Sequence, residues 1–134
     1  MYMPWLPDYT LGVKEIDTQH KEFVRIINDL NDAIEIGSAD IVLGDILAEL
    51  SNYANYHFAT EEKYFDQFHY ELTQEHKQQH NEIRDDLESF MGKYQTDATK
   101  YSQELLVFVK NWFEEHTQGH DRKYIHCFHA NGLE

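Results

Sequence analysis

Cysteine is almost absent from this chain of 134 residues, in which Cys127 is the single example. One cysteine rules out a disulfide within the chain, and such low cysteine usage is typical of a reducing compartment. The first ten residues, MYMPWLPDYT, contain neither the basic segment nor the apolar segment of a secretory signal. We therefore expect the protein to be cytoplasmic.

Basic residues and long apolar runs are also scarce. Eleven basic residues stand against 25 acidic ones, which gives a formal net charge of −14. A surface this acidic repels phosphate backbones and anionic lipids, so we expect no nucleic-acid partner and no membrane-surface binding. There is no run of about 18 apolar residues, so we expect no membrane-spanning helix either.

Proline occurs only at Pro4 and Pro7, so none interrupts a helix in the rest of the chain. Alternating β-branched runs bounded by turns are absent, which argues against strands. Apolar residues instead recur at helical spacing in four stretches, at about 18–36, 40–67, 72–94 and 98–118. Asp17 is placed to cap the first stretch, and Gly37 to end it.

Four helices of similar length with short links predict an all-α fold, an up-down-up-down four-helix bundle. We expect one domain, 1–134, with an N-terminal arm at about 1–17 and a C-terminal tail at about 121–134, in which a short helix or turn follows around 121–128.

Each of the four apolar stripes also contains polar residues. They are His20 in the first, His57 and Glu61 in the second, His76 and His80 in the third, and His116 in the fourth. Residues four apart on a helix differ by about 40° in rotation, so each such pair points the same way. Burying these groups without partners is costly, and imidazoles and carboxylates satisfy one another poorly. A metal ion such as iron, zinc, copper or manganese satisfies both groups, so the pattern predicts a metal site.

The number of candidate ligands favours two ions, because closed tetrahedral zinc sites need only four ligands and usually include cysteine. A second carboxylate, Asp121, follows His116 by five residues, which on a regular helix places it about 140° away. A wide π-type turn would bring both to one face, and Gly119 between them weakens the regular helix. We therefore predict a distorted helix end at 116–121. Two carboxylates can then bridge two ions, one of which keeps an open position.

In this order and at these separations, the residues resemble those of the bacterial hemerythrins, which are non-haem di-iron proteins that bind oxygen. The resemblance runs nearly end to end, through Trp5, LGVKEIDTQH (11–20), HFATEE (57–62), HKQQH (76–80) and WFEEHTQGHDRKY (112–124). A single HxxxH is a weak motif, but the whole set in order is highly specific.

The resemblance implies two iron ions (Fe2+/Fe3+) joined by an oxo or hydroxo group. The implied ligands are His76, His80 and His116 for one iron, His20 and His57 for the other, and Glu61 and Asp121 as bridges. It further implies reversible O2 binding at the open position, for oxygen transport, storage or sensing, and no enzymatic reaction. An electron-transfer or signalling partner is compatible with this function.

One departure from the family concerns the residues after His116. Thr117 and Gln118 stand where aliphatic residues often line the oxygen pocket, and polar residues there would admit water and protons. This favours autoxidation or peroxidase-like turnover, so the alternative function is a di-iron peroxidase, oxidase or redox sensor. The Glu-x-x-His pairs of ferritin-like oxidases and the HExxH of zinc hydrolases are absent, which favours binding.

Three further residues lie close to these motifs. Glu62 differs from Glu61 by about 100° in rotation, so we expect it to point away from the centre. His120 is also expected to point outward. Tyr124 is expected to be a core residue or to form a hydrogen bond near the site.

Overall fold

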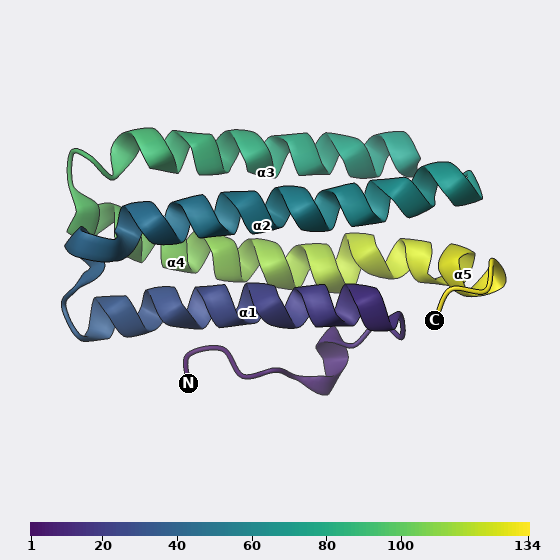
Figure 1. Ribbon diagram of the computed structural model, residues 1–134, viewed down its shortest axis with the longest axis horizontal. Coiled ribbons are helices and arrows are strands. Elements are labelled where there is room, and N and C mark those ends of the chain that lie inside the picture. The colour runs from purple at the N-terminus through teal and green to yellow at the C-terminus, as the bar shows by residue number, and fades with distance from the viewer.

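The chain forms four long helices (Figure 1). Their apolar residues recur at helical spacing, and no proline occurs after residue 7. In the computed structural model, which describes residues 1–134, these are α1 (Lys14–Glu35), α2 (Ala39–Phe68), α3 (Thr73–Lys93) and α4 (Ala98–Glu115). A short 3-10 turn, η1 (Pro7–Tyr9), precedes them. A π-helical turn, η2 (His116–Asp121), joins α4 to a final helix, α5 (Arg122–Ala130), and no strand is present.

The long helices lie side by side and alternate in direction, as Figure 1 shows. α1 packs against α2 and α4, and α3 packs against the same two helices. The predicted all-α, up-down-up-down four-helix bundle is therefore confirmed. α4, η2 and α5 follow one another as one rod along the length of the bundle.

The first helix begins earlier than the sequence predicted, and Asp17 does not cap it. α1 starts at Lys14, and the Asp17 carboxylate lies inside the helix. That carboxylate accepts hydrogen bonds from the backbone N–H groups of Leu11 at 2.8 Å and Gly12 at 3.1 Å. Asp17 thus holds the end of the N-terminal arm rather than the helix start. Gly37 does follow the end of α1, with a φ of +77° that favours glycine.

The fourth helix, α4, ends at Glu115, close to the expected residue 118, but no break in the helical path follows it. The chain continues through η2 into α5, because the wide turn changes the rotation of the helix without breaking it. The segment expected as a tail is therefore mostly helical, up to Ala130.

Two apolar clusters fill the interior, and the predicted polar residues separate them. The larger cluster includes Phe23, Phe58, Ile83 and Phe113, one from each long helix. The smaller cluster lies toward the other end of the bundle and comprises Leu11, Val13, Ile16, Phe65, Tyr70, Tyr124 and Phe128. Along every long helix, the polar positions of the stripe lie between or next to members of these clusters. The core is therefore divided by a polar layer.

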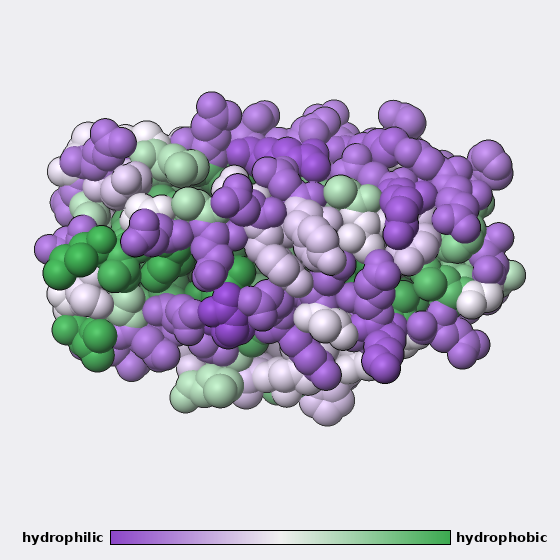
Figure 2. Space-filling view, in the orientation of Figure 1, coloured by the Kyte–Doolittle hydropathy of each residue, from purple (hydrophilic) through white to green (hydrophobic).

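Figure 2 shows that the visible face of the molecule is mostly hydrophilic, with apolar patches gathered toward the two ends. The most exposed apolar side chains of the α1–α2 region are Ile36 and Ile41, beside the link between these helices. No helix combines the length and the apolar character needed to cross a bilayer.

Candidate metal centre

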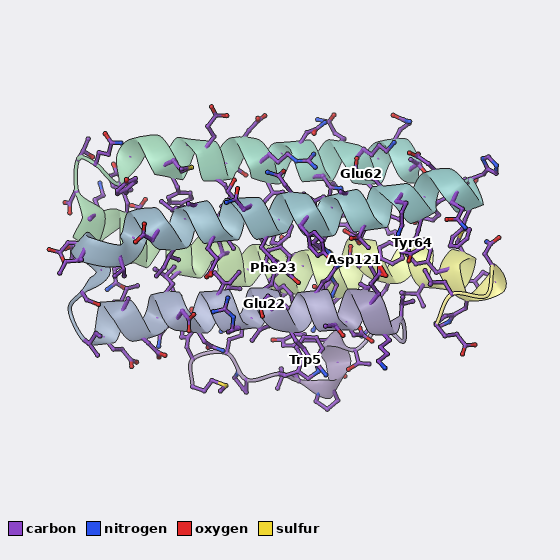
Figure 3. All side chains as sticks on the ribbon, viewed as in Figure 1. Trp5, Glu22, Phe23, Glu62, Tyr64 and Asp121 are labelled. Atoms are coloured by element: carbon purple, nitrogen blue, oxygen red, sulfur yellow. The ribbon has the colours of Figure 1, made fainter.

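The polar layer brings together all seven residues that the sequence singled out as ligands. Each of them is buried: His20, His57, Glu61, His76, His80, His116 and Asp121. They come from α1, α2, α3 and η2, and Figure 3 places Asp121 inside the bundle.

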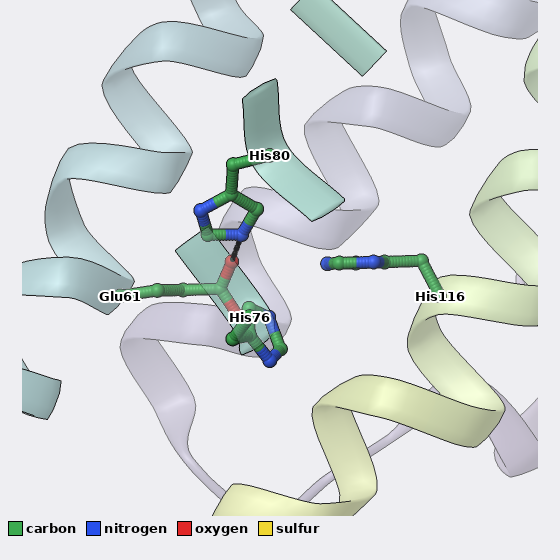
Figure 4. A group of neighbouring side chains, drawn as sticks. All are labelled: Glu61, His76, His80 and His116. Carbon is green, nitrogen blue, oxygen red and sulfur yellow. Dashed lines mark hydrogen bonds and ion pairs between the residues drawn. The ribbon is translucent and has the colours of Figure 1, made fainter. Parts of the chain in front are cut away.

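A first group combines three imidazoles with one carboxylate. The ligand atoms of Glu61, His76, His80 and His116 all lie within 4.8 Å of one another. Glu61 comes from α2, His76 and His80 from α3, and His116 from η2, and Figure 4 shows these side chains pointing toward a common centre. The Nε2 atom of His80 lies 3.1 Å from Oε1 of Glu61.

The second group combines two imidazoles with one carboxylate. His20, His57 and Asp121 also have ligand atoms within 4.8 Å of one another. The two Nε2 atoms of the histidines are 3.1 Å apart, and Nε2 of His20 is 3.1 Å from Oδ2 of Asp121.

The two carboxylates each contact both groups. Oδ1 of Asp121 lies 3.1 Å from Nε2 of His76 and 2.9 Å from Nε2 of His116, while its Oδ2 faces His20. Oε1 of Glu61 lies 3.1 Å from Nε2 of both His57 and His80. Each carboxylate therefore links the histidines of the two groups.

The spacing of these atoms fits metal ligands. Two ligands at about 2.1 Å from one ion and about 90° apart are separated by about 3.0 Å. The ligand atoms named above lie 2.9–3.1 Å apart. Several of them lack a hydrogen-bond partner although they are buried: Nε2 of His76 and His116, Oε2 of Glu61, and both carboxylate oxygens of Asp121. Such unpartnered atoms are costly in a protein interior, and a cation would satisfy them.

The π-helical turn η2 is what places Asp121 in the centre. It spans His116–Asp121, the segment where the sequence predicted a distorted helix, and this prediction is confirmed. The extra residue per turn brings Asp121 to the face of His116, and their side chains meet at 2.9 Å.

The histidines keep both carboxylates ionised. Burial and the charge of Asp121 raise the pKa of Glu61, but contacts with His57 and His80 lower it further, so it stays below its usual range. Burial likewise raises the pKa of Asp121, and His116, His20 and His76 outweigh that effect. The centre therefore offers two anionic carboxylates to a cation.

Contrary to the expectation that it points away from the centre, Glu62 contacts one of the histidines of the centre. Its Oε2 accepts a hydrogen bond of 2.9 Å from Nδ1 of His80, and Figure 3 shows it on the side of α2 near α3. The predicted direction of Glu62 around α2 is correct, but α3 lies on that side of α2 and brings His80 next to Glu62. In the other group, Nδ1 of His57 donates to Oε1 of Gln19 at 2.7 Å, a contact that the sequence did not predict. Gln19 directly precedes His20, so its position in the sequence gave no sign that it contacts His57 on another helix.

Aromatic rings pack around the histidines and fix their planes. Phe58 stacks on His80 with a centroid distance of 3.9 Å, and Trp112 stacks on His116 at 4.9 Å.

Tyr124 is fully buried beside His76, and its hydroxyl has no hydrogen-bond partner. Burial and the negative charges of Asp121 and Glu61 raise the pKa of Tyr124 well above its usual value. It is therefore a neutral core tyrosine next to the site.

The two candidate pocket residues differ in position. Thr117 is buried, whereas Gln118 is exposed on the outside of η2, so the expectation that Gln118 lines a pocket at the centre is wrong. His120 is half-buried, and its Nδ1 pairs with Gln79 Nε2 at 2.9 Å rather than with the ligand cluster. A cleft of about 280 Å³ between α3 and α4 has His116 and His120 among its lining residues, so the centre lies close to the surface there.

The fold and the site together define a helical bundle protein with a buried histidine and carboxylate metal centre. Residues 11–127 match the family described as the hemerythrin HHE cation binding domain. The chain is 34% identical to a bacteriohemerythrin of Clostridium acetobutylicum over 126 residues, which covers 90% of this chain and 97% of that protein. It is 27% identical to a bacteriohemerythrin of Pseudomonas aeruginosa over 124 residues, covering 92% and 80% of the two chains. A bacteriohemerythrin of Methylococcus capsulatus is 26% identical over 129 residues, covering 96% and 98%. The chain belongs to the hemerythrin family.

Proposed function

We propose that this protein binds O2 reversibly at a di-iron centre, for oxygen transport, storage or sensing. The observation that carries the proposal is the uneven division of the ligands. One group has three imidazoles and a carboxylate, whereas the other has two imidazoles and a carboxylate. Two histidines with one carboxylate are typical of non-haem Fe2+ sites that keep open coordination positions.

The proposed cofactor is a pair of iron ions with an oxo or hydroxo group between them. His76, His80 and His116 would hold one ion, His20 and His57 the other, and Glu61 and Asp121 would bridge the two. When bound, a ferrous pair supplies two electrons to O2 and recovers them when O2 leaves. The names of the related bacteriohemerythrins agree with this choice of metal chemistry.

The chain's own residues would restrict the reaction to binding. Phe113 lies 5.5 Å from the ring of His20, and Phe23 lies 5.5 Å from the ring of His57. These apolar rings exclude water from the side with fewer imidazoles, which limits the protons available for further reduction of O2. We therefore propose a binding protein rather than an enzyme, formed as one domain over residues 1–134 and located in the cytoplasm.

An optical spectrum tests the proposed function. The iron-loaded, reduced protein is prepared without oxygen, mixed with O2, and then freed of O2 again. We expect charge-transfer bands that appear with O2 and vanish on its removal, while zinc-loaded protein, which has no accessible second oxidation state, stays featureless. Bands of an oxidised centre that appear and persist would contradict reversible binding and support the alternative of a peroxidase, oxidase or redox sensor.

Thr117 is expected to influence how long the oxygenated form lasts. Thr117 is buried directly after His116, so its hydroxyl is the polar group expected to help water and protons reach the centre. We expect Thr117→Val, which keeps the shape and removes the hydroxyl, to slow autoxidation severalfold in a stopped-flow decay measurement. Gln118→Leu is the matched control, and because Gln118 is exposed its decay should equal that of the unaltered protein. Equal decay of all three proteins would contradict a role for Thr117.

A further inference from the structure

The outer hydrogen bond of His80 ends on a charged group. Its Nδ1 donates to Oε2 of Glu62 at 2.9 Å, so its Nε2 is the nitrogen that would bind a metal ion. Arg84 supports this carboxylate, with one guanidinium nitrogen 3.5 Å from the same oxygen and another donating to Asn55 at 2.7 Å. The ring of Phe58 lies against His80 and under the guanidinium of Arg84. The contact between Glu62 and His80 is therefore held from several sides.

The outer hydrogen bond of His57 ends on a neutral group. Its Nδ1 donates to Oε1 of Gln19 at 2.7 Å. The amide of Gln19 has a defined orientation, because its Nε2 donates to Oγ1 of Thr60 at 3.1 Å, and that hydroxyl donates to the carbonyl of Tyr56. An amide at this position accepts the proton of His57 without adding charge.

The remaining histidine of the same group has no charged outer partner either. Nδ1 of His20 is buried and has no hydrogen-bond partner in the protein. An imidazole that donates to a carboxylate becomes a more basic ligand, whereas one that donates to an amide changes less. A more basic ligand stabilises the higher oxidation state of the ion that it binds.

We propose that Glu62 and Gln19 are positioning residues that make the two halves of the centre unequal, so that the half with His80 favours Fe3+ and the half with His57 favours Fe2+. This inference rests on the proposed iron pair and goes beyond the proposed O2 binding. It assigns the ferrous preference to the half with two imidazoles, which is the half that keeps an open position. The oxidation-state preference and the open position then coincide on one ion.

A reductive titration of the diferric protein tests the inference. Dithionite supplies one electron at a time, so the first electron converts one Fe3+ to Fe2+, and the second electron converts the other. We expect the higher of the two potentials to belong to the half with His57 and the lower to the half with His80. Glu62→Gln should then raise the lower potential, and Gln19→Glu should lower the higher one. Outer-partner changes alter metal affinity by about tenfold or more, and a tenfold change in preference between oxidation states corresponds to about 59 mV for one electron.

The matched control is Glu82→Gln, which removes one negative charge from exposed α3 surface without touching a ligand. Mössbauer spectra of 57Fe-loaded protein confirm two ions per chain and one Fe2+ per chain after the first electron. The inference is overturned if Glu62→Gln leaves the lower potential at the value found for Glu82→Gln. Gln19 is buried, so a charge placed there by Gln19→Glu can prevent folding, whereas Glu62 is partly exposed and tolerates Glu62→Gln. The potentials of Glu62→Gln therefore test the inference even if Gln19→Glu does not fold.

Reversible O2 binding is measured separately on the same samples. Potentials that shift as expected in a protein that oxidises irreversibly with O2 would support the inequality and contradict the proposed function. Reversible binding with unshifted potentials would support the proposed function and contradict the inequality of the two halves. The two ideas can therefore fail independently.

Discussion

Insertion of one alanine after Gly119 is expected to take Asp121 out of the ligand cluster and to lower the iron content well below two ions per chain. The turn η2 already accommodates one residue more than a regular helical turn, so a further residue rotates everything after it by about 100°. Asp121 then no longer faces His116, and the bridge between the two halves of the centre is lost. Tyr124 and Phe128 rotate out of the smaller apolar cluster at the same time. Each large ring removed from a core destabilises the fold by about 3–5 kcal/mol. Iron per chain, measured by elemental analysis after gel filtration, and the melting temperature are the readouts.

The matched control is Gly119→Ala, which keeps the number of residues. A Cβ at this position meets no atom within 4 Å, and Gly119 does not have a positive φ. Alanine favours helix over glycine by up to about 1 kcal/mol, so this variant should retain the iron and melt no lower than the unaltered protein. Full iron content in the insertion variant would show that the five-residue separation of His116 and Asp121 is not required to position Asp121.

Removal of the metal is expected to have the second large effect, on thermal stability. Without a cation, the interior contains unpartnered atoms on Glu61, Asp121, His76 and His116. Each such group destabilises the folded state by about 1–3 kcal/mol. A ligand that binds only the folded state stabilises it by about 4 kcal/mol at a free concentration about 1,000 times its Kd. For a chain of this size, that corresponds to a rise of about 10–20 °C in melting temperature on adding Fe2+ under anaerobic conditions.

Mg2+ provides the control for this melting experiment. It prefers oxygen ligands in octahedral geometry and interacts weakly with imidazole, so it should leave the melting temperature of the metal-free protein nearly unchanged. Equal melting curves for the metal-free and Fe2+-loaded proteins would mean that the cluster does not hold the metal in the folded state.

The parts of the centre that depend on spacing along one helix could be predicted from the sequence. His57 with Glu61 and His76 with His80 are four residues apart, so helix geometry alone places each pair on one face. The position of Asp121 could be predicted because the fifth residue after His116 reaches the same face only through a wide turn. The apolar stripes were enough to predict four helices, and the short links were enough to predict their alternating order.

Contacts between helices could not be predicted in the same way. Glu62 points away from Glu61, as its rotation requires, but α3 lies on that flank and brings Nδ1 of His80 within 2.9 Å. Gln118 is exposed, because the rotation within a π-helical turn depends on where the turn begins. Asp17 is a good helix cap by residue type, yet its carboxylate binds the backbone of the arm, which lies against the helix. Each of these details depends on which neighbouring segment covers a given face.

The polar layer between the two apolar clusters also bears on the order of events during folding. Its ligands come from positions as far apart as His20 and Asp121, so no pair of neighbouring helices contains the whole set. Helical bundles fold quickly because most of their contacts are local, whereas this centre needs α1, α2, α3 and η2 in place together. The proposed iron pair would therefore be held by both halves only after the chain has reached its final arrangement. Complete metal uptake would then report a finished fold, and a chain stalled with α4 undocked would bind iron incompletely.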